Sequence, residues 1–166
     1  MFLFPAIHGA IAAEYWLASP LLNSDPMKVA DTVELEPRAQ AQRLEIPAGI
    51  LGLEHIKEYE LIANPAEEPF MWLQSAGVPD VAFLLISPFL VMPEYRPDIS
   101  DNDSESLGLR GAQDAQVFNI VTVRGASAAT VNLKGPIILN RHTNTARQVV
   151  LNNAADYSVR HPIVIP

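Results

Sequence analysis

Residues 69–97, PFMWLQSAGVPDVAFLLISPFLVMPEYRP, constrain the fold of this chain more than any other segment. Two apolar, strand-like runs flank a Gly-Val-Pro-Asp turn at residues 77–80, and the segment then leads to a tyrosine between prolines, Tyr95. Residues 82–92 are too continuously apolar for a half-exposed strand, so we expect burial on both faces up to Pro88. None of these residues is chemically reactive. The segment therefore predicts a rigid β scaffold that binds.

The remainder of the chain after residue 28 continues this strand pattern. Apolar and polar side chains alternate in residues 57–62 and 130–134, which is typical of half-buried strands. Turn residues separate the runs at spacings of about ten residues, which favours a small all-β domain, an antiparallel sandwich or a barrel-like fold. The other strand-like runs are residues 70–75, 82–86, 117–124, 137–140 and 148–151.

One short helical insert is expected near residues 101–107. Ser100 is a good N-cap, Asp103 stands where a capping-box partner would stand, and Gly108 can end the helix.

The composition excludes several classes of function. The chain has no cysteine, which rules out disulfides, zinc ribbons and thiol catalysis. Its formal net charge is −8, whereas direct nucleic-acid binding needs a basic surface that neutralises phosphates. An acidic chain of this kind is compatible with a basic protein partner, or the charge serves only to keep the protein soluble.

We expect residues 27–166 to form one domain and residues 1–26 to be an extension. Residues 1–22 contain Glu14 and no lysine or arginine, so the positive region of a secretory signal is missing. Three interpretations of the extension stay open: sequence upstream of a start at Met27, a docked amphipathic helix, or an export or anchor segment. Ile7, Ile11, Tyr15 and Ala18 have the spacing of such a helix.

No catalytic or metal-binding motif is found in the sequence. The four histidines have no metal-ligand spacing between them, so we expect no metal, no cofactor and no enzyme activity. A small hydrolase whose aspartates and histidines converge only in space remains the alternative. A concave pocket that gathers His142 or His161 with two carboxylates would support it. The histidines are His8, His55, His142 and His161.

Acidic residues concentrate in residues 94–114. Six acids against Arg96 and Arg110 give this segment a local charge of −4. Two interpretations compete: Asp101 and Asp103 suit the positive end of a helix, or the segment is an acidic docking face for a basic protein. The six acids are Glu94, Asp98, Asp101, Asp103, Glu105 and Asp114.

Eight sequence blocks occur in the order and spacing of one protein family. They are IPAGILGLE at 46–54, PFMWLQS at 69–75, PDVAF at 79–83, PFLVMPEY at 88–95, DISD at 98–101, IVT at 120–122, VNLKGPIILN at 131–140 and QVVL at 148–151. The chain closes with YSVRHP at 157–162. From about residue 27 to residue 162 it resembles the flagellar assembly factor FliW family.

This resemblance implies a non-enzymatic, cytoplasmic, mostly β-barrel protein that binds flagellin and, alternatively, the basic translational repressor CsrA. Flagellin that accumulates would occupy the protein and leave CsrA free to repress flagellin translation. Once flagellin is exported, the protein would capture CsrA and relieve the repression. We therefore expect no direct nucleic-acid or membrane partner and a monomer in the free state. An exported β-domain binding module is a further alternative.

The resemblance makes the acidic segment the first candidate partner surface, because CsrA-like proteins are basic. Its candidate residues are Glu94, Asp98, Asp101 and Asp103, with Tyr95 as an aromatic anchor.

The exposed faces of residues 130–140 are the second candidate surface, where flagellin would need apolar contact. The candidate residues are Asn132, Pro136 and Asn140. The alternative is that Pro136 and Asn140 only shape a turn and end a strand.

Overall fold

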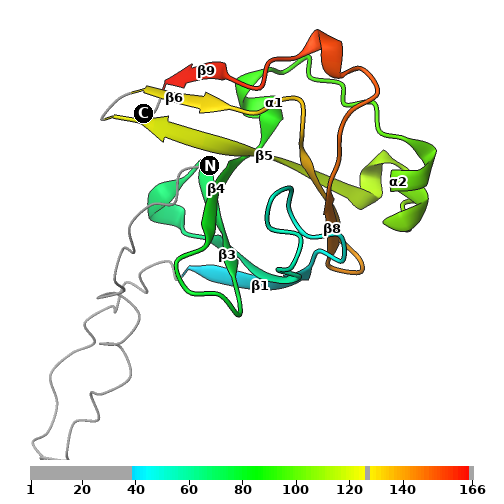
Figure 1. The fold of residues 1–166 in the computed structure, drawn as a ribbon. Coiled ribbons are helices and arrows are strands. Elements are labelled where there is room, and N and C mark those ends of the chain that lie inside the picture. The colour runs from blue at the N-terminus through cyan, green and yellow to red at the C-terminus, as the bar shows by residue number, and fades with distance from the viewer. Residues whose placement is uncertain (1–38, 126–127, 165–166) are drawn as a thin grey trace, which may run out of the picture.

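Nine strands dominate the computed structural model, which describes residues 39–125 and 128–164 (Figure 1). The expected all-β, barrel-like fold is confirmed. Residues 1–26 and Met27 lie outside the described residues. The strands are β1 (Gln40–Glu45), β2 (Glu58–Ala63), β3 (Phe70–Ser75), β4 (Ala82–Ile86), β5 (Ala115–Arg124), β6 (Ala128–Val131), β7 (Ile137–Asn140), β8 (Thr145–Gln148) and β9 (His161–Val164).

Seven of the strands close into a barrel in the order β4-β3-β2-β1-β8-β7-β5, because β4 also pairs with β5. The remaining two, β6 and β9, extend outward from β5. Val121 joins both parts, since it pairs with Leu84 of β4 and with Val131 of β6.

The barrel is mixed, which corrects the expectation of a purely antiparallel sheet. β1 and β8 run parallel and meet at the pair Glu45 and Thr145, whereas all other neighbours are antiparallel. In a closed ring of alternating strands an odd strand number forces one parallel pair. Seven strands therefore cannot close without such a pair.

The expected helix is confirmed as α2 (Asp101–Ser106). The Ser100 hydroxyl accepts the Asp103 N–H at 3.1 Å, and Gly108 follows the helix with φ +64°. A second helix, α1 (Pro88–Val91), was not expected; it begins at Pro88, where proline is well tolerated. The described residues also contain three short 3-10 turns, η2 (Pro65–Glu67), η3 (Ala112–Asp114) and η4 (Ala154–Asp156).

The run of residues 82–92 is less buried than its composition indicated. Ala82 is exposed, Leu85 and Ile86 are buried, and α1 exposes Phe89 and Leu90 to solvent. The helical turn at Pro88 rotates the apolar side chains off the sheet, so only part of the run reaches the core.

The loop between β1 and β2 fills one side of the barrel interior (Figure 1, cyan). Its isoleucines Ile46, Ile50 and Ile56 are buried in one cluster with barrel residues such as Leu73. Gly49 is required in this loop: its φ is +72°, and a Cβ there would lie 2.6 Å from the Glu54 Cα.

A second apolar cluster joins the β5-β6 layer to the loops that precede α2 and follow β8. It contains Ile86, Tyr95, Leu107, Val131 and Leu133. This cluster anchors the acidic segment to the sheet. No helix within residues 39–125 and 128–164 is long and apolar enough to cross a membrane.

Candidate binding surfaces

The stretch from Tyr95 to Ser100 has no regular secondary structure, yet hydrogen bonds hold it in place. The Tyr157 hydroxyl accepts the Arg96 N–H and donates to the Arg96 carbonyl, both at 2.9 Å. The Asn153 amide donates to the same carbonyl at 3.0 Å, and its oxygen accepts the Asp98 N–H at 3.1 Å. The backbone of this stretch is therefore preorganised by the loop that follows β8.

The buried side chain of Tyr95 anchors this stretch to the core. It is 2% exposed, its hydroxyl donates to the Leu133 carbonyl at 2.8 Å, and its ring lies 4.7 Å from that of Tyr157. Burial raises the pKa of the Tyr95 hydroxyl to about 12. In this conformation the side chain presents no surface on which a partner could dock.

The six acids of residues 94–114 separate into two groups. Four carboxylates are exposed, and Arg96 is the one exposed base in the same 94–105 stretch. We call residues 94–105 the acidic segment. Its exposed acids are Glu94, Asp98, Asp101 and Glu105.

Asp103 belongs to the second group, whose carboxylates are engaged within the protein. One of its oxygens lies 2.8 Å from Arg147 Nε on β8, and the other accepts the Ser100 hydroxyl at 2.7 Å. Asp103 thus ties α2 to the barrel wall.

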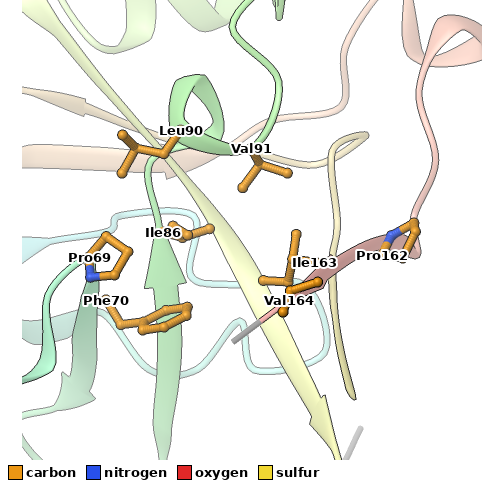
Figure 2. Close-up of a pocket in the computed structure, with 8 residues that line it drawn as sticks. All are labelled: Pro69, Phe70, Ile86, Leu90, Val91, Pro162, Ile163 and Val164. Carbon is orange, nitrogen blue, oxygen red and sulfur yellow. The ribbon is translucent and has the colours of Figure 1, made fainter. Parts of the chain in front are cut away.

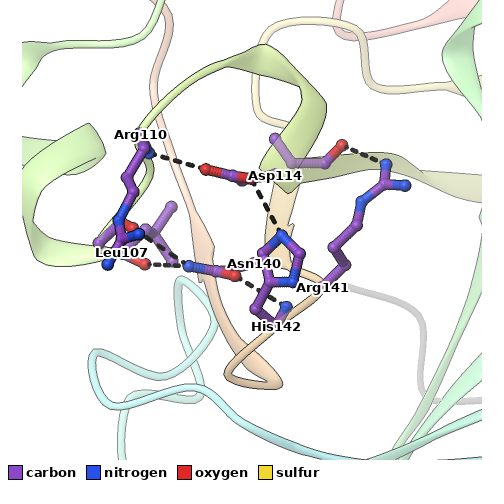
Figure 3. A network of polar contacts seen from close by, with 8 residues as sticks. Leu107, Arg110, Asp114, Asn140, Arg141 and His142 are labelled. Carbon is purple, nitrogen blue, oxygen red and sulfur yellow. Dashed lines mark hydrogen bonds and ion pairs between the residues drawn. The ribbon is translucent and has the colours of Figure 1, made fainter.

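Asp114 is the second engaged acid (Figure 3). One carboxylate oxygen lies 3.0 Å from His142 Nε2, and the other accepts the Arg110 N–H at 2.9 Å. These contacts, the Arg110 N–H first and the His142 hydrogen bond second, lower the pKa of Asp114 below its ordinary value. The pair connects η3 to the turn between β7 and β8.

The hollow beside this pair has a volume of about 260 Å³ and is lined by Gly108, Arg110, Asp114, Asn140, His142 and Thr143. It gathers His142 with one carboxylate, whereas the hydrolase interpretation requires two. No group of three or more His, Cys, Asp or Glu residues suited to a metal ion occurs in the part of the chain that the structure describes. The geometry is that of a structural contact, which holds η3 and the turn between β7 and β8 together.

The second candidate surface, residues 130–140, lies mostly inside the protein. All four residues of β7 are buried, as are Gly135 and Pro136. Asn140, 2% exposed, donates to the Leu107 carbonyl at 2.8 Å and accepts the His142 N–H at 2.9 Å. Asn132 is half-buried, and its side-chain oxygen accepts the Lys134 N–H at 3.1 Å. This geometry favours the alternative in which these residues shape turns and end a strand.

An apolar groove lies between α1 and β9, and no sequence pattern indicated it (Figure 2). Its volume is about 320 Å³. At its rim Leu90 is 64% exposed and Val164 is 88% exposed. Residues 82–92 are continuously apolar, a pattern that usually indicates a buried core. The sequence alone could therefore not reveal a groove here. The groove is lined by Pro69, Phe70, Ile86, Leu90, Val91, Pro162, Ile163 and Val164.

Comparison with known proteins gives one consistent result. The family model described as FliW protein matches residues 28–163. The flagellar assembly factor FliW of Leptospira biflexa is 40% identical over 125 residues, which cover 74% of this chain and 81% of that protein. The protein of the same name from Moorella thermoacetica is 37% identical over 134 residues, 80% of this chain and 82% of its own length.

A solved structure agrees with these relatives. The crystal structure of the flagellar assembly factor FliW matches with a TM-score of 0.65 and 35% identity, over 72% of this chain and 83% of that one.

Proposed function

The chain belongs to the FliW family of flagellar assembly factors, and from this premise we propose that it works by binding two proteins in alternation. One partner is flagellin and the other is a basic translational repressor of the CsrA type. Binding the repressor relieves its action on flagellin translation. The protein acts in the cytoplasm, as a monomer when free, and without catalysis.

The observation that carries the proposal is the exposed, preorganised acidic segment. Asp98 projects from a backbone that hydrogen bonds from Asn153 and Tyr157 already hold in place, and Asp101 is the first residue of the capped helix α2. A preorganised face loses little conformational entropy when a partner binds. Its negative charge favours encounter with a basic protein, at rates that fall as salt screens the charges.

The division of the acids supports a docking role. Asp103 forms the ion pair with Arg147 and Asp114 the contact with His142, whereas the Asp98 carboxylate accepts only a long hydrogen bond, from the Asn152 amide at 3.4 Å. The four exposed carboxylates are not engaged in ion pairs within the described residues. Their charge is therefore available to a partner.

The test is direct binding with purified proteins. The full chain is mixed with the CsrA-type repressor and, separately, with flagellin from the same source, and each complex is followed by calorimetry and co-elution. We expect binding to each, and flagellin should release the repressor from a preformed complex. Absence of binding to both partners would end the proposal.

A further inference from the structure

Phe89 of α1 is an exposed aromatic side chain that packs on the acidic segment. Tyr95, the expected aromatic anchor of that segment, is 2% exposed, whereas Phe89 is 45% exposed. The centroids of the two rings lie 6.1 Å apart, and the rings meet edge to face at an interplanar angle of 68°. Phe89 therefore offers to solvent the aromatic surface that Tyr95 does not.

The ring of Phe89 rests on side chains that hydrogen bonds hold in place. The Tyr95 hydroxyl donates to the Leu133 carbonyl at 2.8 Å, and its ring lies 4.7 Å from that of Tyr157. The Tyr157 hydroxyl in turn binds the N–H and the carbonyl of Arg96. The exposed ring and the backbone of the acidic segment thus belong to one connected arrangement. Little conformational entropy is lost when a partner covers such a surface.

The position of Phe89 is not explained by burial in the core. Among the four residues of α1, only Pro88 is buried, and Phe89 keeps almost half of its surface in solvent. A rigid aromatic side chain that is partly exposed and bordered by polar groups is typical of the residues that dominate binding energy in protein interfaces.

Negative charge follows directly after α1. Glu94 and Asp98 are exposed, and neither carboxylate is engaged in an ion pair within the described residues. Arg96 is the one exposed base of the acidic segment. Lysine and arginine carry an apolar stem beneath the charge, and a guanidinium group also stacks on aromatic rings. A basic segment can therefore contact the ring with its stems and the carboxylates with its charges.

We propose that Phe89 is the apolar anchor of the docking face and that a basic segment of the partner covers its ring. The lysine or arginine charges of that segment pair with Glu94 and Asp98. The docking face then consists of α1 together with the acidic segment. This inference rests on the proposed function, in which the basic partner is the translational repressor.

The two parts of this face contribute in different ways. The carboxylates attract the partner through charge, which salt screens. The ring contributes by removal of apolar surface from water, which does not depend on charge. The inference is therefore testable separately from the role of the acids.

The first test measures the exposure of Phe89 in the wild-type chain. Hydroxyl radicals oxidise exposed side chains, and mass spectrometry compares the free chain with its complex with the CsrA-type repressor. We expect oxidation of Phe89 to fall several-fold in the complex. Oxidation of Val78, 37% exposed on the turn before β4 and thus at the other end of that strand from α1, should stay the same.

Equal oxidation of Phe89 in the free and the bound chain would overturn the inference and leave the proposed function standing. Absence of a complex in co-elution would end both. Flagellin is the third arm of the experiment. Protection of Phe89 by flagellin and not by the repressor would assign the ring to the other partner, which also overturns the inference.

The second test compares Phe89→Ala with the matched control Val78→Ala, each of which truncates an exposed apolar side chain. We expect Phe89→Ala to weaken repressor binding about tenfold, by the same factor at low and high salt, and Val78→Ala to leave it unchanged. Amide NMR spectra confirm that both variants are folded. Unchanged affinity of folded Phe89→Ala, or a loss that appears only at low salt, would contradict an apolar anchor.

Discussion

The acidic segment and residues 130–140 were the two candidate surfaces in the sequence, and the structure treats them in opposite ways. The acidic segment follows α1 and contains no strand, so four of its carboxylates are exposed to solvent, although hydrogen bonds hold its backbone in place. Residues 130–140 continue through β6 and β7, where the apolar face is core and the amides of Asn132 and Asn140 bond to backbone groups. The polar side chains of residues 130–140 are therefore used in hydrogen bonds to the backbone, whereas the exposed carboxylates of the acidic segment are not engaged in ion pairs within the described residues.

The largest expected effect tests the buried side of this comparison. Leu139 lies in β7 with 0% of its surface exposed. Leu139→Ala removes buried methyl groups and leaves a cavity, so the free energy of unfolding should fall by about 2–5 kcal/mol. Denaturant unfolding measures it. A change within experimental error would mean that β7 is a surface strand.

The second effect concerns the support beneath the acidic segment. Tyr95→Phe keeps the ring contacts but removes the donor to the Leu133 carbonyl. A carbonyl left without its partner in the interior costs about 1–3 kcal/mol. Thermal and denaturant unfolding should show this loss, while repressor binding by the folded variant should be little changed. Strong loss of binding with intact stability would instead make the Tyr95 hydroxyl a contact residue.

The third effect is a dependence on pH. Because the folded state lowers the pKa of Asp114, its ionised form adds stability above the ordinary aspartate pKa, and this stability is lost as the pH falls from about 4. Asp114→Asn should lower stability at neutral pH and flatten the acid limb of the profile. Unfolding measured from neutral to acidic pH checks this. A variant with the acid limb of the wild type would exclude Asp114 as its source.

The smallest effect concerns the Asp103–Arg147 pair. Both side chains are partly exposed, so Arg147→Ala should cost about 0.5 kcal/mol, less at high salt. The same variant should leave repressor affinity almost unchanged, since Asp103 faces the barrel. Calorimetry and unfolding at two salt concentrations test both statements. A marked gain in affinity would show that freeing Asp103 adds to the docking face.

Much of the fold could be predicted from the sequence, because alternation and turn residues are local signals. Strand β2, which contains Tyr59 and Leu61, follows that pattern, and both side chains are buried. β1 was missed because its sequence, QAQRLE, has little apolar alternation, and β9 because it is short and contains Pro162. The strand expected at residues 148–151 was placed too late, since β8 runs from Thr145 to Gln148.

The engagement of individual acids could not be predicted from the sequence. Asp103 is paired by Arg147 and Asp114 by His142, residues that only the closed barrel brings near. The capping-box position marks Asp103 in the sequence, but no local pattern reveals its ion pair with Arg147 or distinguishes Asp114 from Asp98 or Asp101. The groove was hidden for a related reason, because Phe89 and Leu90 are apolar residues of a kind that usually marks a core.

One measurement tests the central claim, that the exposed carboxylates of the acidic segment form the docking face for a basic repressor. The variant Asp98→Lys with Asp101→Lys is compared with Glu45→Lys and Glu58→Lys, exposed acids paired across β1 and β2. Repressor affinity is measured by calorimetry at low and high salt. The account predicts that the first pair weakens binding several-fold, more at low salt than at high salt, while the control pair has little effect. Equal affinity for both variants and the wild-type chain would contradict it.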